Sequence, residues 1–153
     1  MREKNLFQGK RIDNEEWVEG YLLQSDLIVP CGQIFNFCKY GDKNLLLEDY
    51  CIEFYRVNPE TVRQHTGLSA YWYDYEDDLL NAEIWEHSLL KVEYENKEVV
   101  AEVRYESGMY ILCSNEFYDS YVPLFNYVAF EDVAYVEAEV VGNIFDTPEL
   151  LKN

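Results

Sequence analysis

The chain has 153 residues, 48% of them hydrophobic and 16% aromatic, which is enough to bury the core of one ordinary domain or of two very small ones. Its formal net charge of −18 is uneven: residues 1–65 hold 8 basic and 11 acidic side chains (−3), and residues 66–153 hold 4 and 19 (−15). Because phosphate groups are bound by clustered Lys and Arg, this balance argues against nucleic acids and anionic membranes as partners.

The N-terminal stretch MREKNLFQGKR is charged from its second residue and has no apolar core, so we expect no secretory signal. No apolar run is long enough to span a bilayer. Four cysteines lack the paired C-x-x-C spacing of a zinc or redox site: Cys31, Cys38, Cys51 and Cys113. We therefore expect reduced cysteines in a cytoplasmic protein, one that needs no metal ion and no cofactor.

Alternating residues and polar turns predict several strands in the first part of the chain. Residues 6–24 read as two strands around a polar turn at 13–16. A short aromatic strand is expected within 26–42, between proline and glycine residues, and another strand within 49–57. The sequence Asn58-Pro59-Glu60 then predicts a capped helical turn.

Residues 69–87 contain the stretch YWYDYEDDLL, in which aromatic and acidic side chains are mixed. With Ser69 as a cap, Trp72, Tyr75 and Leu79 fall on one side of a helix and the carboxylates on the other. The pattern therefore favours a packed amphipathic helix. The alternative is a recognition loop, whose four aromatic residues are the candidate partner-binding residues: Tyr71, Trp72, Tyr73 and Tyr75.

The clearest alternation lies beyond that segment. Strands are predicted at 89–94, 99–105, 109–113 and 136–145, and a Thr-Pro-Glu sequence starts a short helical turn within 146–151. Short strands joined by tight turns predict a small antiparallel barrel or roll. The predicted fold class is mainly β, in three parts that could form one composite domain: a strand-rich part at 1–65, a connecting segment at 66–87 and a barrel at 88–153.

Several stretches of the chain resemble the YopX family, whose proteins are encoded by bacteriophages and by prophages of Gram-positive bacteria. The family's opening is similar to LFQGKRIDNEEWVEGYL (6–22), its central signature to NPETVRQHTGL (58–68) and its C-terminal signature to VVGNIFDTPELL (140–151). The strands between are similar to KVEYENKEVVAEVRYESGMYIL (91–112). The chain departs from the family after Thr66-Gly67-Leu68, where YWYDYEDDLL replaces a shorter turn. The resemblance implies a mainly β protein with an SH3-like barrel or roll in its C-terminal part, and it implies no known activity.

Candidate catalytic residues are few. His65 and His87, with Glu86 and one cysteine, could form a Cys–His pair, but their spacing favours two ordinary surface or turn histidines. The acidic run at 74–78 could attract calcium, yet it lacks the glycine and the terminal glutamate of an EF-hand loop. The sequence also has no glycine-rich phosphate loop. We therefore expect no catalytic, cofactor-binding or metal-binding residues.

Three functions from different classes remain open. The first is a non-enzymatic protein-interaction module of a phage or prophage, which binds a protein partner or a second copy of itself. The second is an acidic DNA mimic that inhibits a host DNA-binding protein, and it rests on the net charge and on the phage association. The third is an enzyme whose site a single sequence does not reveal. The surplus of tyrosine favours the first, because aromatic residues are enriched in binding surfaces.

Overall fold

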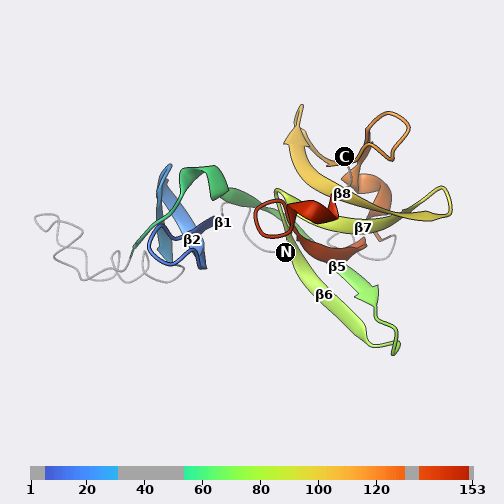
Figure 1. Ribbon diagram of the computed structural model, residues 1–153, viewed down its shortest axis with the longest axis horizontal. Coiled ribbons are helices and arrows are strands. Elements are labelled where there is room, and N and C mark those ends of the chain that lie inside the picture. Colours follow the sequence, from blue (N-terminus) through green and yellow to red (C-terminus); the bar gives the residue numbers. More distant parts are fainter. Residues whose placement is uncertain (1–5, 31–53, 130–134, 152–153) are drawn as a thin grey trace, which may run out of the picture. The chain divides into compact units, whose positions relative to one another are not determined.

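The computed structural model describes residues 6–30, 54–129 and 135–151 (Figure 1). Within these ranges the chain is mainly β, as predicted. Its helical elements there are single 3₁₀ turns: η2 at Pro59–Thr61, η3 at Leu124–Tyr127 and η4 at Pro148–Leu150. None of the helices in this part of the chain is long and apolar enough to cross a bilayer. The chain divides into two compact units, with the boundary between Gln64 and His65.

The first unit is an antiparallel sheet in the order β1–β2–β3–β4: Phe7–Lys10, Trp17–Gln24, Leu27–Pro30 and Tyr55–Arg56. Strands β1 and β2 are the predicted pair within 6–24. The first residues of β5, Arg63 and Gln64, pair with the other edge of β1. The strand predicted within 49–57 is seen only as β4, and the aromatic stretch that follows Pro30 lies outside the described residues.

Four basic side chains in the described part of the first unit are held by contacts within that unit. The Arg63 guanidinium lies 4.5 Å and the Lys10 ammonium 5.5 Å from the centroid of the Trp17 ring. These are cation–π distances. Two further ion pairs join oppositely charged residues of the same unit: Arg11 with Asp13 and Arg56 with Asp26. Lys10, Arg11, Arg56 and Arg63 thus have partners in the fold itself.

The second unit contains two sheets. In one, β5 (Arg63–Tyr73) pairs antiparallel with β6 (Leu79–Trp85) and parallel with β11 (Tyr135–Glu137). The other is antiparallel, in the order β10–β9–β8–β7–β12: Tyr121–Pro123, Met109–Cys113, Lys97–Glu106, Ser88–Tyr94 and Glu139–Asn143. The strands predicted at 89–94, 99–105 and 109–113 correspond to β7, β8 and β9 and are confirmed.

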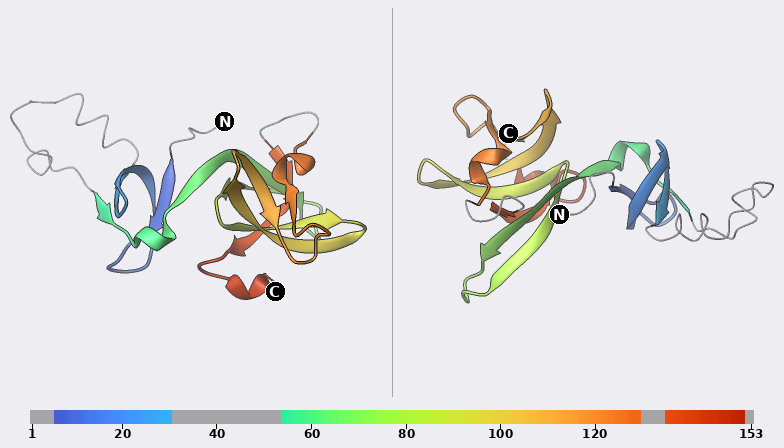
Figure 2. Two further views of the ribbon diagram at one scale, coloured as in Figure 1. Left: turned by 90° about the horizontal axis from the view of Figure 1, so that it is seen from above. Right: turned by 180° about the vertical axis from the view of Figure 1, so that it is seen from behind.

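The helix predicted at 69–87 is wrong, because these residues form most of the β5–β6 hairpin (Figure 2). Leu68, Ala70 and Trp72 alternate along β5 and pack into or against the core. This period of two is that of a strand. Tyr75 and Leu79, which a helix would have buried, are 94% and 56% exposed.

A tight acidic turn closes this hairpin between β5 and β6. Oδ1 of Asp74 accepts hydrogen bonds from the backbone N–H groups of Glu76 (2.8 Å) and Asp78 (2.9 Å). Asp77 has a φ of +61°, which aspartate tolerates better than most residues. The carboxylates of YWYDYEDDLL thus form a turn rather than the polar face of a helix.

The single strand predicted at 136–145 is two strands in the structure. Strand β11 pairs with β5 and β12 pairs with β7, so the chain changes sheets at the buried residue Ala138. The register of β12 shifts between Val140 and Gly142. A Cβ at Gly142 would overlap Oγ1 of Thr147, so the chain needs glycine at this point.

The two helical turns predicted at chain positions 58–60 and 146–151 coincide with 3₁₀ turns. At η2, Oδ1 of Asn58 accepts from the N–H of Glu60 at 3.1 Å, which is the expected cap. At η4, Thr147 makes no side-chain cap. Its hydroxyl instead bonds the backbone of Asn143 (3.1 and 3.2 Å) and closes the loop that follows β12.

The core of the second unit is built from both of its sheets. Ala70 and Ile84 of the β5–β6 hairpin pack with the buried alternating residues of the five-stranded sheet, such as Leu90, Val103 and Leu112. Burying one such aliphatic side chain contributes about 1.5–3 kcal/mol. This packing fixes the base of the β5–β6 hairpin, while the residues near its turn stay in water.

Candidate partner-binding groove

The second unit has a groove of about 520 Å³ beside β5. Tyr71, Trp72 and Tyr73 of β5 line it, together with residues from β7, β8 and the β11–β12 segment. Successive residues of a strand point to opposite faces, so three consecutive lining residues place the groove along the edge of β5. Three of the four predicted partner-binding residues are thus brought together in one hollow.

The fourth predicted residue, Tyr75, lies in the hairpin turn and does not line the groove. It is one of four large, exposed apolar side chains around this turn. We call these four residues the hairpin tip: Tyr73, Tyr75, Leu79 and Leu80. Tyr73 and Leu79 face each other across β5 and β6, and both are more than half exposed. Apolar surface gathered in this way is typical of a binding site.

The wall of the groove is fixed by contacts of Tyr71. Its hydroxyl donates a hydrogen bond of 2.7 Å to Oε1 of Glu137. Its ring meets the ring of Tyr135 edge to face, with centroids 6.2 Å apart. Its carbonyl accepts from the N–H of Ala138 at 3.3 Å. These contacts join β5 to the point where the chain changes sheets.

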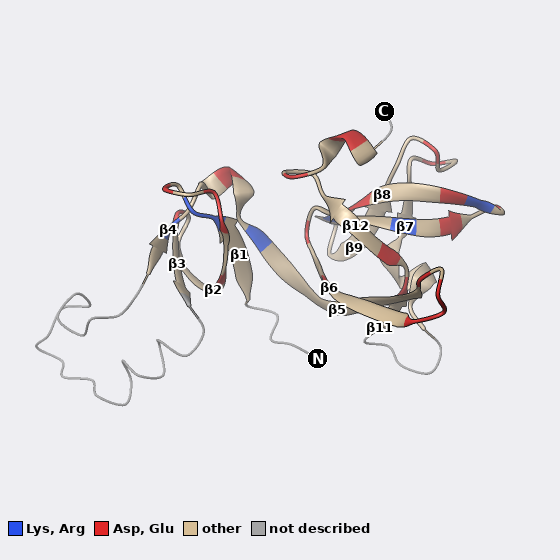
Figure 3. Cartoon of the chain, turned by 60° about the horizontal axis from the view of Figure 1, so that its bottom comes forward, with Lys and Arg blue, Asp and Glu red and all other residues tan. Residues whose placement is uncertain are grey.

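The groove carries four carboxylates against one ammonium group: Glu93, Glu98, Glu137 and Glu139 against Lys91. Nζ of Lys91 lies 2.6 Å from Oε2 of Glu139, and this hydrogen bond raises the pKa of Lys91. Glu93 and Glu98 stand directly opposite each other on β7 and β8. Figure 3 shows that the turn of the β5–β6 hairpin carries acidic residues and no basic one. The groove is therefore aromatic and strongly acidic.

Residues 6–152, nearly the whole chain, match the family model described as YopX protein. The chain belongs to the YopX family. The resemblance seen in separate stretches of the sequence is confirmed by this match. No curated protein and no solved structure matches the chain.

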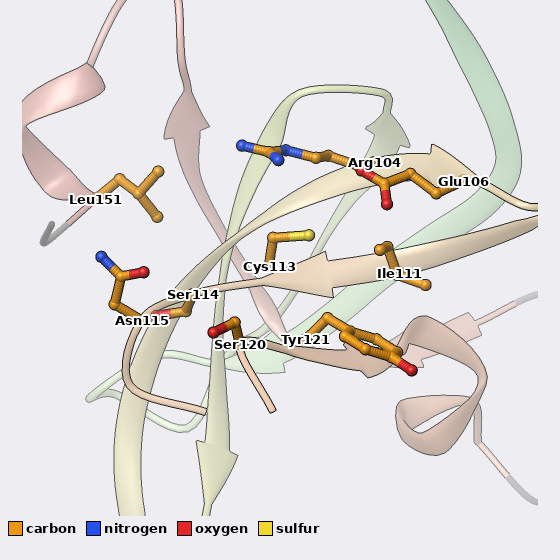
Figure 4. Close-up of a pocket in the computed structure, with 9 residues that line it drawn as sticks. All are labelled: Arg104, Glu106, Ile111, Cys113, Ser114, Asn115, Ser120, Tyr121 and Leu151. Carbon is orange, nitrogen blue, oxygen red and sulfur yellow. The ribbon is translucent and has the colours of Figure 1, made fainter. Parts of the chain in front are cut away.

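This YopX-family chain has a second, smaller hollow of about 270 Å³, on β8, β9 and β10 (Figure 4). Arg104 and Tyr121 line its sides, and the thiol of Cys113 points into it. Burial raises the pKa of Cys113, which keeps the thiol protonated near neutral pH. A protonated thiol is a poor nucleophile and a poor metal ligand.

A buried charge network, which no pattern in the sequence predicts, lies next to this hollow. The side chain of Glu102 is only 5% exposed and accepts from both Nε and Nη2 of Arg104, at 3.0 and 3.1 Å. Nδ1 of His87 lies 2.9 Å from Oε2 of the same carboxylate. Burial by itself would raise the pKa of Glu102, but the hydrogen bonds from His87 and Arg104 outweigh it and lower the pKa.

The two histidines lie in different surroundings. His65 is buried rather than on the surface, with Nδ1 accepting from the N–H of Gly67 at 2.8 Å and the ring against Trp85. His87 sits in the β6–β7 turn on Glu102. In the part of the chain that the structure describes, neither histidine forms a hydrogen bond with Cys113. A Cys–His pair is not assembled there.

Three carboxylates of the hairpin turn come close enough to hold one cation. Ligand oxygens of Asp74, Glu76 and Asp78 lie within 4.8 Å of one another. Oδ1 of Asp74 already accepts from two backbone N–H groups, so the turn is ordered by its own hydrogen bonds. Exposed acidic turns of this kind occur without a metal ion, and the prediction that the chain needs none still stands as a prediction.

Proposed function

We propose that the chain is a non-enzymatic protein-interaction module, encoded by a phage or prophage and acting in the bacterial cytoplasm. One observation carries the proposal: the groove lined by Tyr71, Trp72 and Tyr73 opens beside the exposed hairpin tip. Interfaces are enriched in aromatic side chains, and a few such anchors supply most of the binding energy. The partner is a protein, and a second copy of this chain counts as one.

The scaffold of this module is an SH3-like barrel in our proposal. Its support is the strand order β10–β9–β8–β7–β12, in which β12, the last strand along the chain, pairs with β7, the first strand of this sheet along the chain. The 3₁₀ turn η3 lies in the chain between β10 and β12. Small barrels of this connectivity host many unrelated binding sites, so the fold does not name the partner.

Two features favour a module over the other functions. The raised pKa of Cys113, and the lack of a hydrogen bond from it to His65 or His87 in the described residues, speak against a thiol enzyme that uses Cys113. The carboxylates of the groove share it with three aromatic residues of β5, whereas a DNA mimic needs a continuous acidic stripe. The internal contacts of Lys10, Arg11, Arg56 and Arg63 also support the expectation that the chain does not bind nucleic acid.

Affinity capture with two matched double variants tests the proposal. The immobilised chain is exposed to a lysate of the bacterium that encodes it, and retained proteins are identified by mass spectrometry. The variant Tyr73→Ser/Leu79→Ser removes two exposed residues of the hairpin tip. The control Tyr121→Ser/Leu150→Ser removes the same residue types at exposed positions away from the groove. Circular dichroism melts establish that both variants fold.

We expect the wild type and the control to retain the same protein and the hairpin-tip variant to lose it. Sedimentation of the purified chain reveals whether that protein is a second copy. Equal retention by all three chains, or no specific protein retained by the wild type, contradicts the proposal.

A further inference from the structure

We infer that the groove takes a cationic, extended segment of the partner, with at least one Lys or Arg side chain entering between the aromatic residues and the carboxylates. This inference rests on the proposed function and adds the chemistry of the partner to it. Three features of the groove carry it: its uncompensated charge, its aromatic residues and an open strand edge.

The negative charge of the groove is only partly balanced by its one lysine. Lys91 forms an ion pair with Glu139 and is close enough to Glu98 to interact with its charge, and Glu137 accepts from Tyr71. Glu93 and Glu98 remain, exposed and directly opposite each other in the β7–β8 register. Like charges in this position repel, so the folded chain carries a small cost there. A cation bound between them would remove it.

The aromatic residues of the groove suit the same ligand. A Lys or Arg side chain has an apolar stem and a charged head. The stem can pack on Trp72 and Val92, which line the groove, while the head reaches the carboxylates. Aromatic faces also attract guanidinium and ammonium groups directly. An acidic or neutral side chain would gain the apolar contact only.

The open edge of β5 explains why the ligand is extended. The N–H of Asp74 bonds the carbonyl of Asp78 on the β6 side, and the carbonyl of Tyr71 accepts from Ala138 on the β11 side. Backbone groups of a strand alternate in direction, so the N–H and C=O of Tyr73 point to the β11 side. Strand β11 ends opposite Tyr71 and does not reach them. A segment lying in the groove can therefore pair with Tyr73 as an added strand.

The test uses short fluorescein-labelled peptides and fluorescence polarisation. One peptide alternates Arg with Val, and two others have Glu or Gln in place of every Arg. The chain is the wild type, the variant Glu93→Gln/Glu98→Gln, or the control Glu106→Gln/Glu149→Gln. The control carries the same change of net charge at exposed positions outside the groove.

We expect the Arg peptide to bind more tightly than the other two, with an affinity that falls as NaCl is raised. The groove variant should weaken binding of the Arg peptide about tenfold, and the control variant less than about twofold. No preference for the Arg peptide, or an equal loss in both variants, overturns the inference, because the attraction would then be absent or a property of net charge alone.

The same variants separate this inference from the proposed function. If the partner retained from the lysate is lost by Tyr73→Ser/Leu79→Ser but is retained fully by Glu93→Gln/Glu98→Gln, the module stands and its preference for a cationic segment is wrong. If the hairpin-tip variant retains the partner as well as the wild type, the proposed function itself is wrong.

Discussion

The hydroxyl of Tyr71 and the carboxylate of Glu137, 66 positions apart in the sequence, are joined by a hydrogen bond of 2.7 Å at the wall of the groove. The bond ties β5 to β11 at the point where the chain leaves one sheet for the other. It lies in exposed surroundings, so water can replace either partner. Its contribution is therefore to the shape of the groove more than to the stability of the fold.

Tyr71→Phe should change the free energy of unfolding by less than about 1 kcal/mol, because the phenyl ring keeps its contact with Tyr135 and water solvates Glu137. Tyr71→Ala removes the ring as well and should cost more. Urea unfolding of the two variants measures the difference. A loss of several kcal/mol in Tyr71→Phe would show that the hydrogen bond holds the two sheets together.

Trp72→Ala should destabilise the chain by about 2–3 kcal/mol, less than the truncation of a fully buried Trp, because the indole packs against the core and is only partly buried. The control Tyr75→Ala removes an aromatic residue that is 94% exposed and should stay within about 0.5 kcal/mol of wild type. Thermal melts compare them. Equal melting temperatures for both variants would mean that Trp72 does not support the core.

Glu102→Gln should destabilise the chain by about 3 kcal/mol near neutral pH, since it leaves Arg104 and His87 without the buried carboxylate they share. The folded state lowers the pKa of Glu102, so the ionised carboxylate adds to the free energy of unfolding. This stabilisation is fully present above the ordinary carboxyl pKa, and it is lost as the pH falls through the lower pKa of the folded state. The difference in the free energy of unfolding between wild type and variant should therefore shrink below about pH 4.

Unfolding measured across this pH range checks the expectation, with Glu106→Gln as an exposed control on the same strand that changes stability by less than about 0.5 kcal/mol. If Glu102→Gln lowers the free energy of unfolding by the same amount down to acidic pH, Glu102 does not stabilise the fold as an ionised carboxylate.

Gly142→Ala should lower the free energy of unfolding by more than about 2 kcal/mol, because the new Cβ would overlap Oγ1 of Thr147, which is itself bonded to Asn143. Gly108→Ala is the control: its φ of +85° is strained for alanine, but the Cβ would meet open space, so about 1 kcal/mol is expected. Denaturant unfolding ranks the two variants. If Gly142→Ala is more stable than Gly108→Ala, Thr147 does not approach Gly142 closely.

The sequence could predict the strands whose neighbours in the chain are also their neighbours in the sheet. Strands β7, β8 and β9 form a meander, and alternation with short turns locates them. The β5–β6 hairpin was missed because Trp72, Tyr75 and Leu79 also fit a helical spacing. The alternation of Leu68, Ala70 and Trp72 along β5 was the signal that could have decided between the two.

The features that the sequence could not predict depend on pairing between strands that are far apart in the chain. The break at Ala138 exists because β5 and β7, both far away in the sequence, each pair with one half of the predicted strand. Glu102 lies at a polar position in the alternation of β8, and this pattern predicts an exposed side chain. In the structure its carboxylate is bonded by Arg104 and His87. The aromatic residues of the groove were found from the sequence because of their density, whereas the opposed Glu93 and Glu98 need the strand register.

Site-specific photo-crosslinking tests whether the groove and the hairpin tip hold a protein partner. A photoreactive phenylalanine replaces Tyr73 at the edge of the groove, or Tyr121 at the second hollow, both of them exposed tyrosines. Each chain is irradiated in a lysate of the bacterium that encodes it. We expect a covalent adduct with a single protein from position 73 and none from position 121. An adduct from position 121 alone, or none from either position, would contradict it.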